Sequence, residues 1–156
     1  MIYNMLDNNP ELLLKNEDYP KNYINMAHPD DYKLSDIPVR ELIFNSYGNH
    51  NRLLLRISFK IDNKYVPITF VCDTGAPMYL YLSPKALNIL NSRICQDEIN
   101  NLYITIDIRD RQQKIGIHES PVNHNESNII GLLLLNKLGL LVDNNTFELK
   151  YLHDYF

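Results

Sequence analysis

Residues 66–77 read Val66-Pro67-Ile68-Thr69-Phe70-Val71-Cys72-Asp73-Thr74-Gly75-Ala76-Pro77, and they are the most informative segment of the sequence. A mostly apolar run ends at a carboxylate, which predicts a buried strand that delivers Asp73 into a loop. A buried carboxylate is costly unless it is hydrogen-bonded or shared with another group. Thr74 offers a hydroxyl that donates and accepts, and Gly75 lacks the Cβ that would keep another backbone away. The loop is therefore the candidate site.

The loop sequence Asp73-Thr74-Gly75-Ala76 resembles the signature of the retropepsins, the single-domain aspartic proteases of retroviruses, retroelements and some cellular proteins. The family's second element is two apolar residues and a glycine followed by a helix, and Ile129-Ile130-Gly131 with residues 132–138 is similar to it. The resemblance covers residues 53–152. It implies a mostly β fold, an acid-protease (retropepsin-like) closed barrel or sandwich with one or two short helices and an N-terminal extension.

The resemblance also implies an activity, the hydrolysis of peptide bonds by water held between two carboxylates that share one proton. This chain has a single Asp-Thr-Gly, and its second element carries no acid. Asp73 would therefore work with its symmetry mate in a C2 homodimer. The implied supporting residues are Thr74, Gly75 and Ala76 in the active loop and Ile129, Ile130 and Gly131 in the second motif. The implied substrate is a protein or polyprotein, and neither a cofactor nor a metal is implied.

The surrounding pattern predicts a hairpin, a loop and a helix, and then the same order again. Apolar and polar residues alternate over residues 53–61 and again over 102–109, which is typical of a half-buried strand. Ser83-Pro84 predicts a helix N-cap and first helical residue, and Gly139 predicts a helix end. The predicted hairpins cover residues 53–72, 102–121 (with the return strand from Lys114) and 140–152.

Residues 1–50 are predicted to be an N-terminal extension of uncertain structure, and residues 51–156 the retropepsin-like domain. Asn9-Pro10-Glu11 favours a short helix through residues 12–14. Further on, a helix from Ser35 or Asp36 to about Gly48 and a strand over residues 39–44 are both compatible with the sequence.

Three features depart from the family pattern. No glycine occurs between Gly75 and Gly116, so the lid expected in residues 91–101 is shortened, stiff or missing, or else the 102–118 hairpin serves as the lid. Pro77 and Leu132 stand where many retroviral members carry an acid and an arginine. The aromatic tail, residues 151–156, either builds the dimer interface or covers the core.

Composition excludes several other functions. The net charge of −4 argues against nucleic acid as a partner. No apolar run approaches the length of about 18 residues that spans a bilayer, and the start resembles no secretory signal. The expected location is the cytoplasm or a virion. His118-Glu119 and His124 do not have zinc-site spacing. The alternative function is a catalytically silent retropepsin-fold interaction or oligomerisation module.

Overall fold

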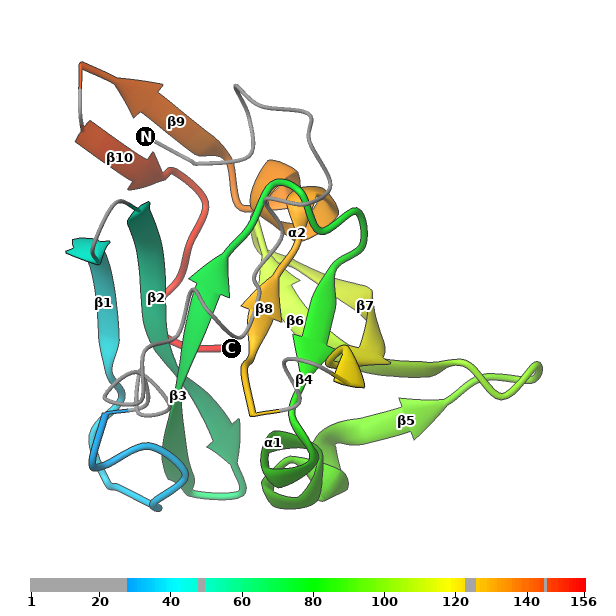
Figure 1. The fold of residues 1–156 in the computed structure, drawn as a ribbon. Coiled ribbons are helices and arrows are strands. Elements are labelled where there is room, and N and C mark those ends of the chain that lie inside the picture. Colours follow the sequence, from blue (N-terminus) through cyan, green and yellow to red (C-terminus); the bar gives the residue numbers. More distant parts are fainter. Residues whose placement is uncertain (1–27, 48–49, 123–125, 145) are drawn as a thin grey trace.

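In a computed structural model the chain is mostly β, with ten strands and two short helices in the residues that the structure describes, which are 28–47, 50–122, 126–144 and 146–156 (Figure 1). This confirms the predicted fold class. None of the described helices has the length and apolar character needed to cross a bilayer. The strands are β1 (Arg40–Tyr47), β2 (His50–Ile61), β3 (Lys64–Cys72), β4 (Leu80–Leu82), β5 (Ile94–Gln96), β6 (Leu102–Ile108), β7 (Arg111–Glu119), β8 (Ile129–Ile130), β9 (Leu140–Asp143) and β10 (Thr146–Leu149). The helices are α1 (Pro84–Ile89) and α2 (Leu132–Lys137), with a 3₁₀ helix at Asn91–Arg93.

Eight strands form one sheet in the order β1-β2-β3-β8-β4-β7-β6-β5, and β9 and β10 form a separate hairpin. β8 pairs in parallel with β3 and antiparallel with β4. The chain leaves β3, makes the loop that contains Asp73 and continues as β4, and β8 fills the position between these two strands (Figure 1). This insertion holds Ile129 and Ile130 beside the loop.

The predicted hairpins are present. β2 pairs antiparallel with β3 from Leu53 opposite Cys72 to Ile61 opposite Lys64, and β6 pairs with β7. Arg109 and Asp110, both at positive φ, make the turn between β6 and β7. A turn this tight lets the return strand begin at Arg111, earlier than the predicted Lys114.

β2 is buried on both faces over residues 52–59, so the prediction of a half-buried strand is wrong for Arg56 and Ser58, while Lys60 is exposed as predicted. Its apolar face is in the core as expected, with Ile57 and Phe59 fully buried. Arg56 and Ser58 on the other face are buried as well. The reason is a cover from earlier in the chain, where the Val39 N–H donates to Ser58 Oγ at 2.7 Å. Alternation within a strand cannot reveal what packs on its polar face.

The residues before β2 pack on the sheet. β1 pairs with β2 along its whole length, so the strand alternative is confirmed and the helix alternative is wrong. Ahead of β1, Ser35 bridges to Tyr65, and the Tyr32 N–H donates to Pro67 O at 2.9 Å. The predicted helix at residues 12–14 lies outside the described residues.

Residues 94–104 form a hairpin that extends away from the body of the molecule (Figure 1). Its tip is built without glycine, because Asp97 Oδ1 accepts hydrogen bonds from the N–H groups of Ile99 and Asn101, each at 2.9 Å. Asn100 takes the left-handed conformation that the turn needs, with φ 66°. Part of the segment predicted as a shortened, stiff or missing lid is thus a short hairpin with a pinned turn.

The C-terminal tail packs against the core of the same chain. Phe156 is buried, and its ring centroid lies 5.3 Å from that of Phe59. The Phe156 N–H donates to Ser58 O at 2.8 Å, and the Lys60 N–H donates to Phe156 O at 3.0 Å. The Arg93 guanidinium also donates to Lys60 O and Phe156 O. Phe156 therefore follows the core-covering alternative.

Candidate active site

Asp73 lies where β3 ends, in a loop fixed by backbone hydrogen bonds. Its N–H donates to Ile130 O at 2.9 Å, and its carbonyl accepts from the Ala76 N–H at 3.1 Å. Its side-chain Oδ1 accepts from the Gly75 N–H at 2.8 Å. Only 6% of Asp73 is exposed. The loop is therefore built around a buried acid that a backbone N–H orients.

The two predicted motifs lie against each other. The Gly131 N–H donates to Tyr79 O at 2.9 Å, and the next N–H, of Leu132, donates to Ala76 O at 2.8 Å. A Cβ placed on Gly131 would stand 2.2 Å from Met78 O and 2.7 Å from Ala76 O. The backbone at Gly131 therefore closes on the active loop at a distance that only glycine permits. Of the predicted site residues, Asp73 to Ala76 and Ile129 to Gly131 are brought together in this interlock.

Thr74 carries a polar atom whose hydrogen-bonding capacity is unmet. Its Oγ1 is buried and has no hydrogen-bond partner in the described part of the chain. A buried hydroxyl without a partner costs about 1–3 kcal/mol, and such groups are rare in native proteins. The unmet hydroxyl stands in the loop, next to Asp73.

Asn128 connects the base of the site to three other segments, and sequence reasoning missed it. Its carbonyl accepts from the Val71 N–H at 2.8 Å, two residues before Asp73. Its side-chain Oδ1 accepts from the Ser83 N–H at 2.9 Å, and its Nδ2 donates to the Tyr32 hydroxyl at 2.7 Å. Ser83 is the predicted N-cap of α1 and accepts from the Ala86 N–H. A buried polar hub thus ties the N-terminal segment to the strand that carries Asp73.

Tyr81 on β4 was also missed, because nothing in the local sequence separates it from an ordinary strand tyrosine. Its ring packs with Ala76 and Ile129 in a small apolar cluster on the outer face of the sheet. Its hydroxyl accepts from the Met78 N–H at 3.0 Å. Burial raises the pKa of Tyr81, the Met78 N–H lowers it, and the negative charge of Asp73 raises it. Tyr81 is therefore within electrostatic reach of Asp73.

The thiol of Cys72 is predicted to be unreactive in the folded chain. Burial, and then the charge of Asp73, raise its pKa to about 12, so the thiol stays protonated at neutral pH. Cys95 on β5 is exposed. Maleimide labelling followed by mass spectrometry should add one group to the native chain and two after unfolding. Cys95→Ser is the matched control and should take no label when native; rapid labelling of Cys72 in that variant would contradict the packing described here.

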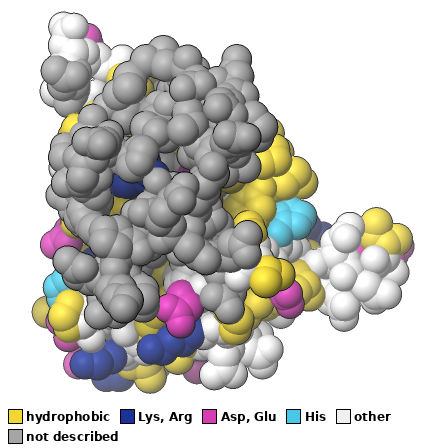
Figure 2. Space-filling model, viewed as in Figure 1, with side chains coloured by type: hydrophobic (Ala, Val, Ile, Leu, Met, Phe, Trp, Pro, Cys, Tyr) yellow, Lys and Arg dark blue, Asp and Glu magenta, His cyan; other side chains and the backbone are white. Residues whose placement is uncertain are grey.

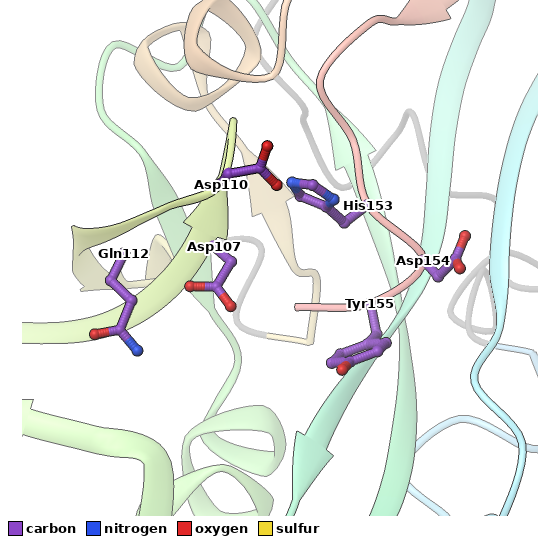
Figure 3. A pocket seen from close by; sticks show the side chains of 6 residues that line it. All are labelled: Asp107, Asp110, Gln112, His153, Asp154 and Tyr155. Carbon is purple, nitrogen blue, oxygen red and sulfur yellow. The ribbon is translucent and has the colours of Figure 1, made fainter.

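A second group of acids lines a cavity of about 410 Å³ away from the loop, between the β6–β7 turn and the tail (Figure 3). In Figure 3 the Asp110 carboxylate points toward the ring of His153. Asp107 and Asp154 there are exposed, so solvent screens their charges. No three His, Cys, Asp or Glu side chains in the described ranges are placed to hold a metal ion. The cavity lacks the buried, oriented carboxylate found at Asp73, which makes it the weaker candidate.

Comparisons with known proteins find structural similarity but no sequence family for this chain. No protein-family model matches it, and no curated protein matches it. Among solved structures it is similar to a retropepsin-like aspartic protease from Rickettsia conorii, with 21% identical residues over 72% of this chain and 90% of that chain, and a TM-score of 0.41. Because the sequence identity and the TM-score are this low, the function of this chain is inferred from its own residues and their geometry.

Proposed function

We propose that this chain is an aspartic endopeptidase of the retropepsin type, active as a homodimer on protein or polyprotein substrates in the cytoplasm or in a virion. The observation that carries the proposal is the interlock of the two motifs. Asp73 is oriented by the Gly75 N–H, and the loop behind it is closed by the backbone at Gly131. The cavity lined by Asp107 and Asp110 offers no comparable arrangement.

The requirement for a second copy follows from the number of acids. The loop supplies one carboxylate, and the neighbouring motif at Ile129–Gly131 supplies none. Two-fold symmetry would bring a second Asp73 to the first. The hydroxyl of Thr74, which has no partner in the described chain, would then find an acceptor or donor in the loop of the other copy.

The proposed chemistry is acid–base catalysis without a covalent intermediate. Two carboxylates about 3 Å apart share one proton. The ionised Asp73 takes a proton from the bound water as the water oxygen attacks the peptide carbonyl carbon, and the protonated Asp73 of the other copy gives its proton to the carbonyl oxygen. Collapse of this diol breaks the carbon–nitrogen bond. The Asp73 that took the water proton gives it to the leaving nitrogen, and one diol hydroxyl returns its proton to the Asp73 of the other copy, so the products are a carboxylic acid and an amine and the pair again holds one proton.

We divide the chain functionally into an extension, residues 1–50, and a catalytic unit, residues 51–156. The division does not separate independent folding units, since β1 pairs with β2 along its full length. Asp31 of the extension also pairs with Arg56 of the catalytic unit at 3.0 Å. The extension therefore serves in part as a structural cover of the catalytic unit.

The alternative function, a catalytically silent interaction or oligomerisation module, is favoured by one specific observation. Asp73 is only 6% exposed in the single chain. A substrate or a second copy therefore reaches its carboxylate only after the surroundings of the loop open. A module that never opens would keep the same fold without activity.

The deciding experiment compares the wild type with Asp73→Asn. Asparagine matches aspartate in size but cannot act as a base, so cleavage of a peptide library between about pH 4 and 7 should be lost, while the far-ultraviolet circular dichroism stays the same. Sedimentation should show dimers for both proteins. Stable dimers with no cleavage in either protein would favour the module. Equal cleavage by both proteins would remove Asp73 from the site.

Asp97 is predicted to control the 94–104 hairpin as the lid of the proposed site. Asp97→Ala removes the acceptor of two N–H groups, each net hydrogen bond being worth about 0.5–1.5 kcal/mol. Faster hydrogen exchange at Ile99 and Asn101 and a several-fold higher KM are expected. Glu98→Ala is the matched control, because Glu98 is the neighbouring acid in the same turn and its side chain is exposed. Equal exchange in the two variants would contradict a turn pinned by Asp97.

A further inference from the structure

A single row of side chains crosses the outer face of the sheet. Strand register places each member opposite the next, over β1, β2, β3, β8, β4 and β7. The row consists of Ile43, Leu54, Val71, Ile129, Tyr81 and His118. Its central members form a small apolar cluster with Ala76 of the active loop. Figure 2 shows exposed hydrophobic side chains beside a histidine on one side of the molecule, whereas Leu54, Val71 and Ile129 of the row are buried.

Asp73 belongs to the same face as this row. Side chains two apart on a strand point to the same side, so Asp73 follows Val71, while Cys72 between them points into the core. The next position after Ile129 on that face is Gly131, which has no side chain. Tyr81 packs against the cluster that contains Val71 and Ala76, so an extended peptide laid across this face to Asp73 would lie near Tyr81 once the surroundings of the loop open.

The Tyr81 hydroxyl is oriented with its proton available. It accepts from the Met78 N–H at 3.0 Å and donates to no acceptor in the described part of the chain. A phenol that already accepts a backbone N–H still has one O–H to donate. The raised pKa of Tyr81 keeps that proton in place at neutral and acid pH.

We propose that Tyr81 is a specificity-determining residue that donates its hydroxyl proton to a neutral amide side chain, glutamine or asparagine, next to the scissile bond. The inference rests on the proposed function. An amide supplies the carbonyl acceptor, and its methylenes would contact Val71, Ala76 and Ile129, which are buried in the single chain and become accessible only when the surroundings of the loop open. A carboxylate would offer the same acceptor, but the charge of Asp73 opposes it. An aliphatic side chain leaves the hydroxyl without a partner.

The test uses matched peptides with glutamine, glutamate or leucine at each position flanking the cleaved bond. Wild type should cleave the glutamine peptide with a kcat/KM about three- to tenfold above the leucine and glutamate peptides, the range of one net hydrogen bond. Tyr81→Phe keeps the ring and should bring the glutamine-to-leucine ratio to about one. If Tyr81→Phe only disturbs the loop, the rates for both peptides fall and their ratio is unchanged, and that result would overturn the inference. A glutamine-to-leucine ratio near one in the wild type would overturn it as well.

Binding separates this inference from the proposed function. The same peptides are titrated into Asp73→Asn, with and without Tyr81→Phe, and followed by nuclear magnetic resonance. If the wild type cleaves nothing but a glutamine preference in binding is lost with Tyr81→Phe, the enzyme proposal fails and the Tyr81 contact stands. If no peptide is either bound or cleaved, both fail.

Discussion

Replacing Asp31 with alanine is expected to lower the free energy of unfolding by about 3–5 kcal/mol, the usual cost of leaving one member of a buried ion pair alone. The Asp31 side chain is 1% exposed and that of Arg56 is 7% exposed, with Arg56 Nε 3.0 Å from Asp31 Oδ1. The other oxygen of Asp31 accepts from the N–H groups of His28 and Thr69. Alanine would leave the guanidinium and both N–H donors without their acceptor. Glu41 Oε2, 3.9 Å from Arg56 Nη1, is the carboxylate that could replace Asp31 as the partner of Arg56.

Asp36→Ala provides the matched control for Asp31. Asp36 pairs with Lys64, but both side chains are at least half exposed, and such surface pairs contribute about 0–1 kcal/mol. Urea unfolding followed by circular dichroism should give a much lower midpoint for Asp31→Ala than for Asp36→Ala, with similar slopes. Asp31→Asn, which keeps an acceptor and loses the charge, should fall between. Equal midpoints for Asp31→Ala and Asp36→Ala would show that the extension does not hold the sheet.

The site motifs were predictable because their signals are local. The apolar strand that ends in Asp73-Thr74-Gly75 indicates where an acid follows a buried strand. The glycine after Ile129-Ile130 indicates where two backbones come close. Residues 53–61 and 102–109 alternate strongly enough to define their strands. Ser83 and Gly139 mark the start of α1 and the end of α2 by the chemistry of caps, and the structure bears out both.

The missed features depend on contacts between distant residues. Nothing near Asp31 in the sequence indicates a buried acid, because its partner Arg56 lies on a strand that reads as half exposed. Tyr81 gains its place only when β8 inserts between β3 and β4 and sets the register of the face. A count of glycines left open whether residues 91–101 were short, stiff or missing, and it could not show that the carboxylate of Asp97 fixes the turn. Features of this kind become visible only when the strand order is known, and the periodicity of the sequence does not reveal them.

Replacing Gly131 with alanine is expected to damage the loop and the fold together. The new Cβ would stand 2.2 Å from Met78 O and 2.9 Å from Met78 C, both backbone atoms that cannot rotate away. Gly131 has φ −86°, which any residue adopts, so the effect is purely steric. Overpacking costs about 1–3 kcal/mol and sometimes more. The displaced backbone carries the Asp73 loop. We therefore expect the urea midpoint to fall, and the cleavage rate of the fraction that remains folded to fall as well.

Gly116→Ala separates crowding from the simple loss of a glycine. A Cβ there would lie 3.9 Å from the Tyr79 ring, an ordinary contact, and alanine in place of glycine restricts the unfolded chain, which favours the fold by about 0.4–1 kcal/mol. The two variants should therefore move the urea midpoint in opposite directions. If Gly131→Ala unfolds at the same urea concentration as wild type, the loop carbonyls do not close on residue 131, and the interlock that orients Asp73 is absent in solution. If the urea midpoint falls equally in both variants, the effect comes from replacing any glycine and not from the contact between the new Cβ and Met78.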